Sequence, residues 1–450
     1  MSLPEPATPA KSDAPEADKS DAALTNADAA DAAGRGSFVR RWIPCYGTAG
    51  FLLILAGIAA ALRMGIVAAK PLARAKERWA FVRQDSSKGS LKWEDAAVLG
   101  THWSTLAALG LVAAAFFTMR WWVPRRRKNN INRATDSASA SASVSASDFT
   151  TNTTADSAPD PVPDSSSHFA PAPAYASNRS RWFGPALLAL LILAGALRLP
   201  LASGSLWWDE LWNIKYATVG EWKQEPLNAD AATFQPTSWP RAAWYYNKPT
   251  NHPVVSLPSK LGHEIWRAVT QPEDPGAFNE TVLRLPVLLA GLAAILLTAN
   301  LARRLAGDPA ALFTAALMAI HPWLLRYGVD ARSYGMAVFF IATGLTALER
   351  ATHPETRRPA LWWWLFGACQ FFLMWSHVVA HLAVCAGLCA AVAWLILRSK
   401  SPDKFQKLAR LLVINALAAA FLLVAFLPNL LQALTWGERN DDGNLLTGSY

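Results

Sequence analysis

The sequence predicts an all-α polytopic membrane protein with about nine transmembrane helices, and three observations support this. Of its 450 residues, 52% are hydrophobic and only 17% are charged, whereas soluble domains average about 25% charged residues. The apolar residues form long stretches separated by polar connections. The 21 tryptophans suit membrane interfaces, where amphipathic rings collect. The net charge of +9 resides in short loops between apolar stretches, so we expect no nucleic-acid partner.

The chain opens with polar and apolar parts in alternation. Residues 1–42 are rich in Ala, Asp, Ser and Pro and have no apolar signal-peptide core, which predicts a disordered tail. An accessory transmembrane hairpin is expected over 43–122, with spans Ile43–Leu62 and Val98–Met119. Residues 123–180, rich in Ser, Ala and Pro, bury too little apolar area to fold and are expected to form a disordered linker.

A transmembrane module is predicted over 181–431, followed by a polar outer tail over 432–450. Each of its seven apolar stretches is close to the length of about 20 residues that crosses a bilayer as a helix. The stretches are Trp182–Leu201, Val282–Leu305, Ala310–Leu325, Ala331–Leu348, Ala360–Ser376, Val378–Leu397 and Leu408–Leu430. All four cysteines lie in or beside apolar stretches, so we expect buried thiols and no disulfide framework.

The loop cations predict the orientation. Three alternate connections carry Arg303 and Arg304; Arg350, Arg357 and Arg358; and Arg398, Lys400, Lys404, Lys407 and Arg410. By the positive-inside rule these face the cytoplasm. The loop Ala202–Thr281, about 80 residues long, then lies outside a plasma or inner membrane, and its length suggests a functional role. The first hairpin opposes the rule, because its outer loop is basic; either Met64–Arg78 is a helix lying on the membrane or one span does not cross.

Asp209 and Glu210 are the first candidate catalytic residues. They follow the apolar stretch that ends at Leu201, and three tryptophans surround them. Carboxylates are costly near a membrane, which favours a functional role. The alternative is that they complement the dipole of an interfacial helix. A helix-like stretch continues to Thr218, and a second amphipathic segment is predicted over Val254–Val269, so that two segments would form a platform on the outer face.

Further polar residues are expected at the same face. His252 precedes the second amphipathic segment, although a solvated loop histidine would look the same. His321, Arg326, Arg332 and Tyr334 lie around one tight outer turn, and arginine binds phosphate oxygens in a bidentate manner. The alternative for Arg326 is contact with lipid headgroups.

One helix carries a row of residues that resemble metal ligands. His377, His381, Cys385 and Cys389 follow one another at a spacing of four. Each step descends about 6 Å along a helix, so four such residues cannot share one ion. Helix packing is the favoured interpretation, with a polar role for His377 at the outer end.

Several short motifs resemble one family in order and spacing. They are Arg198-Leu199-Pro200, Ser205-Leu206-Trp207-Trp208-Asp209-Glu210, Asn251-His252-Pro253, His321-Pro322 and Ala331-Arg332-Ser333-Tyr334. Over Trp182–Leu430 the chain resembles the GT-C membrane glycosyltransferases. This superfamily includes the protein mannosyltransferases of family 39, the bacterial aminoarabinose transferases and the RgtA/B/C/D-like sugar transferases.

The resemblance implies a seven-span module with two juxtamembrane helices in its first outer loop. Its activity would be transfer of a sugar from a polyprenyl-phosphate donor to a lipid, glycan or protein acceptor at the outer face, among membrane lipids. Asp209 would be the catalytic base, with Glu210 as its neighbour, and transfer by single displacement would invert the anomeric centre. Arg332 would stabilise the departing phosphate, with Arg326 and His252 as further candidates. Some relatives carry lysine in place of His252, and some use a divalent metal near the acidic pair.

Two other functions remain open at this point: a non-catalytic relative that has kept the fold, and a transporter or flippase of lipid-linked sugars. A transporter is expected to carry charged or broken helices near the middle of the bilayer. Here the ionisable residues gather at one face, which favours surface chemistry.

Overall fold

The computed structural model describes residues 46–84, 91–123, 181–225, 228–246, 251–353, 356 and 358–439. The predicted disordered tail, almost all of the predicted linker and the end of the predicted polar tail lie outside these residues. Residues 432–439 of that tail continue the last helix.

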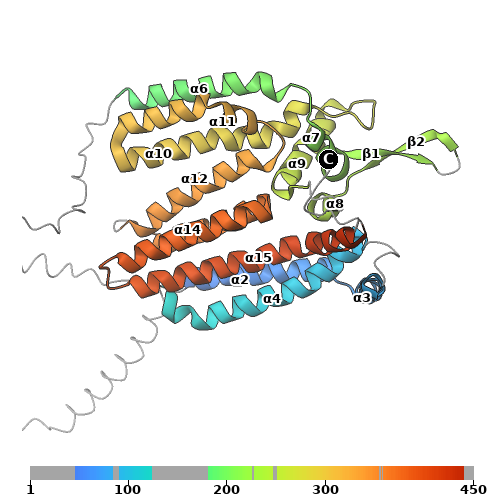
Figure 1. Cartoon of the computed structure of the whole chain (residues 1–450), viewed down its shortest axis with the longest axis horizontal. Coiled ribbons are helices and arrows are strands. Elements are labelled where there is room, and N and C mark those ends of the chain that lie inside the picture. The colour runs from blue at the N-terminus through green and yellow to red at the C-terminus, as the bar shows by residue number, and fades with distance from the viewer. Residues whose placement is uncertain are drawn as a thin grey trace, which may run out of the picture.

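Long helices lie side by side and form the body of the protein (Figure 1). They are α2 (Tyr46–Ile66), α4 (Trp93–Trp122), α6 (Phe183–Ala202), α10 (Glu280–Ile320), α12 (Ser333–Thr352), α13 (Pro359–Ser376), α14 (Val378–Arg398) and α15 (Lys404–Arg439). Within the described part of the chain, six helices are long and apolar enough to cross a membrane: α2, α4, α6, α10, α14 and α15. The chain is therefore a polytopic helical membrane protein, while the count of nine spans stays a prediction.

Helix α10 contains two of the predicted spans. Gly307 has a φ of 84° and interrupts the helical backbone between them, a conformation that glycine adopts without a steric penalty. Ile295 and Ala299 of the first limb share a core with Ala311 and Ala315 of the second. The second limb ends at Ile320, five residues before the predicted end, because Pro322 begins the short helix α11 (Pro322–Tyr327).

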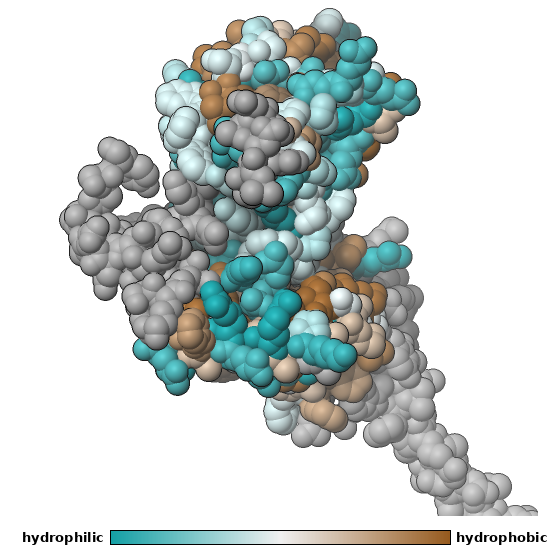
Figure 2. Space-filling model, turned by 90° about the vertical axis from the view of Figure 1, so that its right-hand side faces the viewer, coloured by the Kyte–Doolittle hydropathy of each residue, from teal (hydrophilic) through white to brown (hydrophobic). Residues whose placement is uncertain are grey.

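The elements of the loop 202–281 gather at one end of the bundle (Figure 1). They are α7 (Trp208–Asn213), the π-helix η3 (Ile214–Thr218), β1 (Gly220–Glu225), β2 (Asn228–Pro236), α8 (Trp239–Trp244) and α9 (Pro253–Thr270). The helical stretch to Thr218 and the segment over Val254–Val269 are confirmed. Figure 2 shows that much of this end is hydrophilic.

The antiparallel hairpin β1–β2 is absent from the all-α prediction, which is incomplete in this respect. Its register pairs Gly220 with Pro236 and Trp222 with Phe234. The rings of that second pair lie 5.4 Å apart, and aromatic cross-strand pairs stabilise two-stranded sheets. The hairpin depends on pairing between two segments, and neither segment alone indicates a strand.

The basic loop of the first hairpin lies at the same end as α7–α9. It contains α3 (Ala69–Gln84), which is shifted towards the C-terminus relative to the helix predicted over Met64–Arg78. Arg74 on α3 pairs with Asp95 on α4 at 3.2 Å. The basic loop therefore lies at the end that the alternating directions of the helices require (Figure 1). The positive-inside rule, applied to its cations, would have placed it at the opposite end.

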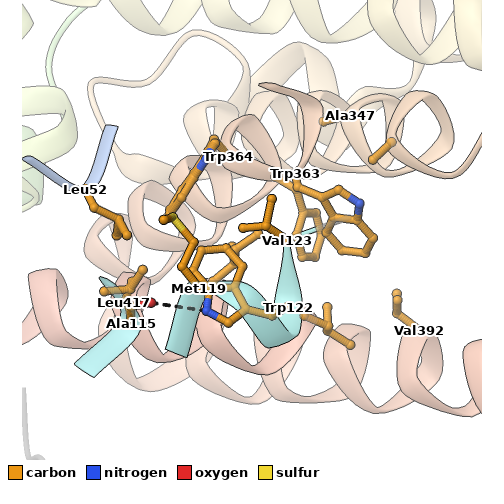
Figure 3. Packing of buried hydrophobic residues seen from close by; sticks show 14 of the residues in the cluster. Leu52, Ala115, Met119, Trp122, Val123, Ala347, Trp363, Trp364, Val392 and Leu417 are labelled. Carbon is orange, nitrogen blue, oxygen red and sulfur yellow. Dashed lines mark hydrogen bonds between the residues drawn. The ribbon is translucent and has the colours of Figure 1, made fainter. Parts of the chain in front are cut away.

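A large apolar core joins the first hairpin to the C-terminal helices (Figure 3). Leu52 on α2 and Met119 on α4 pack with Trp363 on α13 and Leu417 on α15. At the end of α4, Arg410 Nε donates to the carbonyl oxygen of Trp122 at 3.0 Å. The division into an accessory hairpin and a module stays a prediction, but in this structure the two parts share one core.

Gly100 permits the close approach of α4 to α15. A Cβ atom there would lie 2.5 Å from the backbone nitrogen of Pro428. Gly100→Ala should therefore destabilise the protein, since overpacking costs about 1–3 kcal/mol. Gly110→Ala is the matched control on the same helix, because no heavy atom lies within 4 Å of its Cβ position. We expect the thermal midpoint in detergent to fall for the first variant alone, and equal midpoints would contradict this packing.

Candidate active site

The site begins at the short helix α7, whose N-terminus is fixed by Glu210. Glu210 Oε2 accepts a hydrogen bond from the backbone N–H of Trp207 at 2.9 Å, which satisfies one of the free donors at the helix start. Asp209 and Glu210 are neighbours, so their side chains point in different directions around α7. Asp209 is half-exposed, whereas Glu210 is completely buried.

Glu210 forms a buried, bidentate ion pair with Arg284 at the start of α10. Arg284 Nε donates to Oε1 at 3.0 Å and Nη2 donates to Oε2 at 2.6 Å. Arg284 also donates to the carbonyl oxygens at the end of α6, the shortest contact being 2.7 Å to Gly204. Burial raises the pKa of Glu210, but the bonds from Arg284 and from the backbone N–H groups of Trp207 and Ala331 outweigh it and lower the pKa overall.

These contacts favour a structural role for Glu210, and the catalytic role predicted for it stays a prediction. Both of its carboxylate oxygens accept bonds from the protein, and the side chain is inaccessible. Glu210 is a positioning residue that ties α7 to α6 and α10.

Glu210 also fixes the turn before α12. Its Oε1 accepts a bond from the backbone N–H of Ala331 at 2.6 Å. The three consecutive residues of this turn then diverge: Asp330 lines a polar pocket, Ala331 packs in an apolar cluster with Val255, and Arg332 extends to Asp209.

Asp209 and Arg332 form the accessible centre of the site. Arg332 Nη2 lies 2.9 Å from Asp209 Oδ2, and the two side chains are 27% and 47% exposed. The guanidinium of Arg332 also lies 5.2 Å from the ring centre of Tyr334. The structure therefore brings Asp209 together with Arg332 and Tyr334, although Asp209 and Tyr334 are 125 positions apart in the sequence.

His252 is held beside this pair by its neighbour Asn251. Asn251 Nδ2 donates to the carbonyl oxygens of Ala242 and Tyr245, both at 3.0 Å. His252 Nδ1 lies 2.9 Å from the carbonyl oxygen of Ser376 and donates to it, which leaves Nε2 as the acceptor nitrogen.

The electrostatics of His252 do not support a cationic role. Burial, together with the charges of His377 and Arg332, lowers the pKa of His252 to about 4. The histidine is therefore neutral near pH 7, and with Nδ1–H donating to Ser376 its Nε2 can accept a hydrogen bond but cannot donate one to a phosphate. His377 stacks on it with ring centres 5.6 Å apart, so His377 also belongs to this neighbourhood.

Two further predicted residues, Arg326 and His321, have other surroundings. Arg326 covers the ring of Trp207 at 4.2 Å and lies 3.3 Å from Asp330. Arg326 lines a polar pocket of about 520 Å³. His321 is exposed at the junction of α10 and α11.

An apolar groove of about 540 Å³ opens between α9, α10, α12 and α13. Its walls include Pro253, Ala293, Met336, Phe340 and Trp375. Pro253 directly follows His252, and Trp375 lies two residues before His377. Val254 and Met336 of the groove wall also pack in one cluster with Ala331, so the groove borders the turn that carries Arg332.

The sequence alone does not mark Arg284 or Asp330 as site residues. Arg284 lies near the start of a predicted span, and a charged residue in a span is itself a signal of function or pairing. Asp330 lies in the same outer turn as Arg332, but nothing in the sequence distinguishes the directions of their side chains.

A metal site is not apparent in the described residues, which hold no cluster of three or more His, Cys, Asp or Glu side chains able to bind an ion. The divalent metal near Asp209 stays a prediction. Cys369, Cys385 and Cys389 are free thiols. Cys389 lies 3.1 Å from Asn415 Oδ1 on α15, as expected for helix packing.

Comparison of the chain with protein-family models, curated proteins and solved structures found no match.

Replacing Glu210 by glutamine should strongly destabilise the fold. It leaves the buried charge of Arg284 without a counter-charge, and breaking a buried pair costs about 3–5 kcal/mol. Asp209→Asn is the matched control, since exposed pairs contribute about 0–1 kcal/mol. Unfolding in detergent should separate the two variants at neutral pH. Because the folded pKa of Glu210 is lowered, its stabilisation is present above the ordinary glutamate pKa and is lost as pH falls through the folded value. Equal stability of both variants would refute the structural role.

Proposed function

We propose that the protein is a membrane glycosyltransferase that takes a sugar from a polyprenyl-phosphate donor and transfers it, with inversion, to an acceptor hydroxyl at the outer face. The observation that carries this proposal is the apolar groove, whose wall residues Val254 and Met336 pack with Ala331 directly before Arg332, the partner of Asp209. Such a groove suits an isoprenoid chain, and a phosphate attached to that chain would meet Arg332 at its mouth.

The charges at the groove mouth fit the phosphate. Arginine binds phosphate oxygens through two parallel N–H donors, and Arg332 is partly exposed. Its guanidinium is paired with the Asp209 carboxylate at 2.9 Å. A phosphate would compete with the Asp209 carboxylate for this guanidinium, because both groups are anions. Donor binding would thus release the Asp209 carboxylate at the point where an acceptor arrives.

The reaction requires one base and one stabilised leaving group. The acceptor oxygen attacks the anomeric carbon and its proton passes to Asp209. The bond between that carbon and the phosphate oxygen breaks, and the phosphate keeps the electron pair. Arg332 offsets the charge that develops on it. Neutral His252 supplies no donor to this charge, because its one N–H is bound to the carbonyl oxygen of Ser376.

Removing the base should slow turnover without removing the donor site. We expect Asp209→Asn to lower turnover by a factor on the order of 10²–10⁴. Arg332→Ala should weaken binding of undecaprenyl phosphate as well as turnover, since its charge contacts the phosphate before and during departure. Glu273→Gln, an exposed acid of the same loop, should leave both unchanged. The assay uses protein reconstituted in liposomes with a panel of polyprenyl-phosphate sugars and acceptors. Wild-type turnover in Asp209→Asn would remove Asp209 from the mechanism.

Filling the apolar groove should affect long lipids more than short ones. Ala293→Phe places a ring in the groove wall, and we expect affinity for undecaprenyl phosphate to fall on the order of tenfold, or about 1.4 kcal/mol. Farnesyl phosphate, whose chain is shorter, should lose less. Leu296→Phe is the control on the same helix, at a side chain that is 45% exposed. An equal loss for both lipids would contradict occupation of the groove by the isoprenoid chain.

A further inference from the structure

A second cavity lies beside the candidate site and differs from the groove in chemistry. This polar pocket of about 520 Å³ is formed by the end of α6, the start of α7 and the turn at 326–330. Its lining includes Trp207, Trp208, Arg326 and Asp330. The volume lies within the range of small-molecule sites, about 300–1,000 Å³.

The groups that can meet a ligand in the polar pocket are few. Arg284 lines it, but its donors are used by Glu210 and by carbonyl oxygens of residues 201–205. The rings of Trp207 and Trp208 are 55% and 69% exposed. The Arg326 side chain is 45% exposed, and the Asp330 carboxylate is almost buried at the pocket wall.

The charges of the polar pocket favour a neutral ligand. Arg326 Nε lies 3.3 Å from Asp330 Oδ2, so the two formal charges offset each other. A phosphate would lie close to the carboxylate of Asp330 in the pocket wall and would be repelled by it. Burial and the charge of Glu210 raise the pKa of Asp330 against the opposing effect of Arg326, which indicates that more negative charge is disfavoured there.

The same groups suit a ring that carries hydroxyls. A carboxylate accepts hydrogen bonds and a guanidinium donates them, and a hydroxyl does both. Flat indole faces offer a large apolar contact to the C–H face of such a ring. A site built to bond hydroxyls also discriminates against analogues that lack them.

The polar pocket adjoins the reactive pair. Trp208 immediately precedes Asp209, and Asp330 lies two residues before Arg332 in the turn that Glu210 fixes. We propose that this pocket binds a neutral sugar ring of the acceptor and so brings an acceptor hydroxyl to Asp209. The acceptor assignment rests on the proposed glycosyl transfer, whereas sugar binding by the pocket does not.

The test is direct binding to the full-length protein in lipid nanodiscs, without sugar-headed detergent. Saturation-transfer NMR is recorded with methyl α-mannoside, lactose, maltose and chitobiose, and with a Ser/Thr-rich peptide. We expect wild type to contact at least one sugar. Trp207→Ala and Asp330→Asn should each weaken that contact by about 3- to 10-fold, as expected for loss of one aromatic or polar contact. Trp222→Ala, which removes an exposed indole from β1 outside the pocket, should bind as wild type.

Separate measurements distinguish the possible failures. Binding of undecaprenyl phosphate should be unchanged in Trp207→Ala. If this variant instead weakens binding of a polyprenyl-phosphate sugar as much as binding of the free sugar, the ring belongs to the donor and the acceptor assignment is overturned. Sugar binding by a wild type that neither binds undecaprenyl phosphate nor turns over donors would refute the proposed function and leave a sugar pocket.

The remaining outcomes concern the pocket itself. Contact with the peptide alone, contact with none of the sugars, or wild-type affinity in both Trp207→Ala and Asp330→Asn would overturn the proposal.

Discussion

The buried ion pair of Glu210 and Arg284 is the interaction on which the candidate site depends. Two buried charges are costly to desolvate, and the pair is tolerated because its geometry is bidentate and the remaining donors of Arg284 meet backbone carbonyls. The pair joins α6, α7 and α10. Through the backbone N–H of Ala331 it also reaches the turn before α12. Three segments, α7, the start of α10 and the turn before α12, thus converge on one carboxylate, and Arg284 links them to the end of α6.

The accessible chemistry follows from this buried centre. Because Ala331 is held by Glu210, the residues on either side of it are directed outward in fixed and different directions. Asp330 faces the polar pocket, and Arg332 meets Asp209. The polar pocket and the apolar groove both adjoin this turn, one lined by tryptophans and an ion pair, the other by apolar side chains. Such a contrast suits a reaction between an amphipathic lipid and a polar partner.

The body of the protein holds the groove walls in place. Helix α13 contributes to the groove through Phe372 and Trp375, and its opposite end packs Trp363 and Trp364 against the first hairpin. The hairpin therefore supports the same helix that borders the groove. Its connecting helix α3 lies at the end of the bundle that carries the site (Figure 1).

The sequence by itself determined the helical membrane class and indicated most of the long helices, and it drew attention to Asp209, Glu210 and Arg332. These features depend on local composition, since about 20 apolar residues suffice to indicate a span. It did not determine the hairpin β1–β2, whose Trp222–Phe234 pair forms only when two strands meet. Nor did it distinguish Glu210 from Asp209. One residue is buried against Arg284 and the other faces Arg332, and only the packing of α7 against α10 decides between these environments.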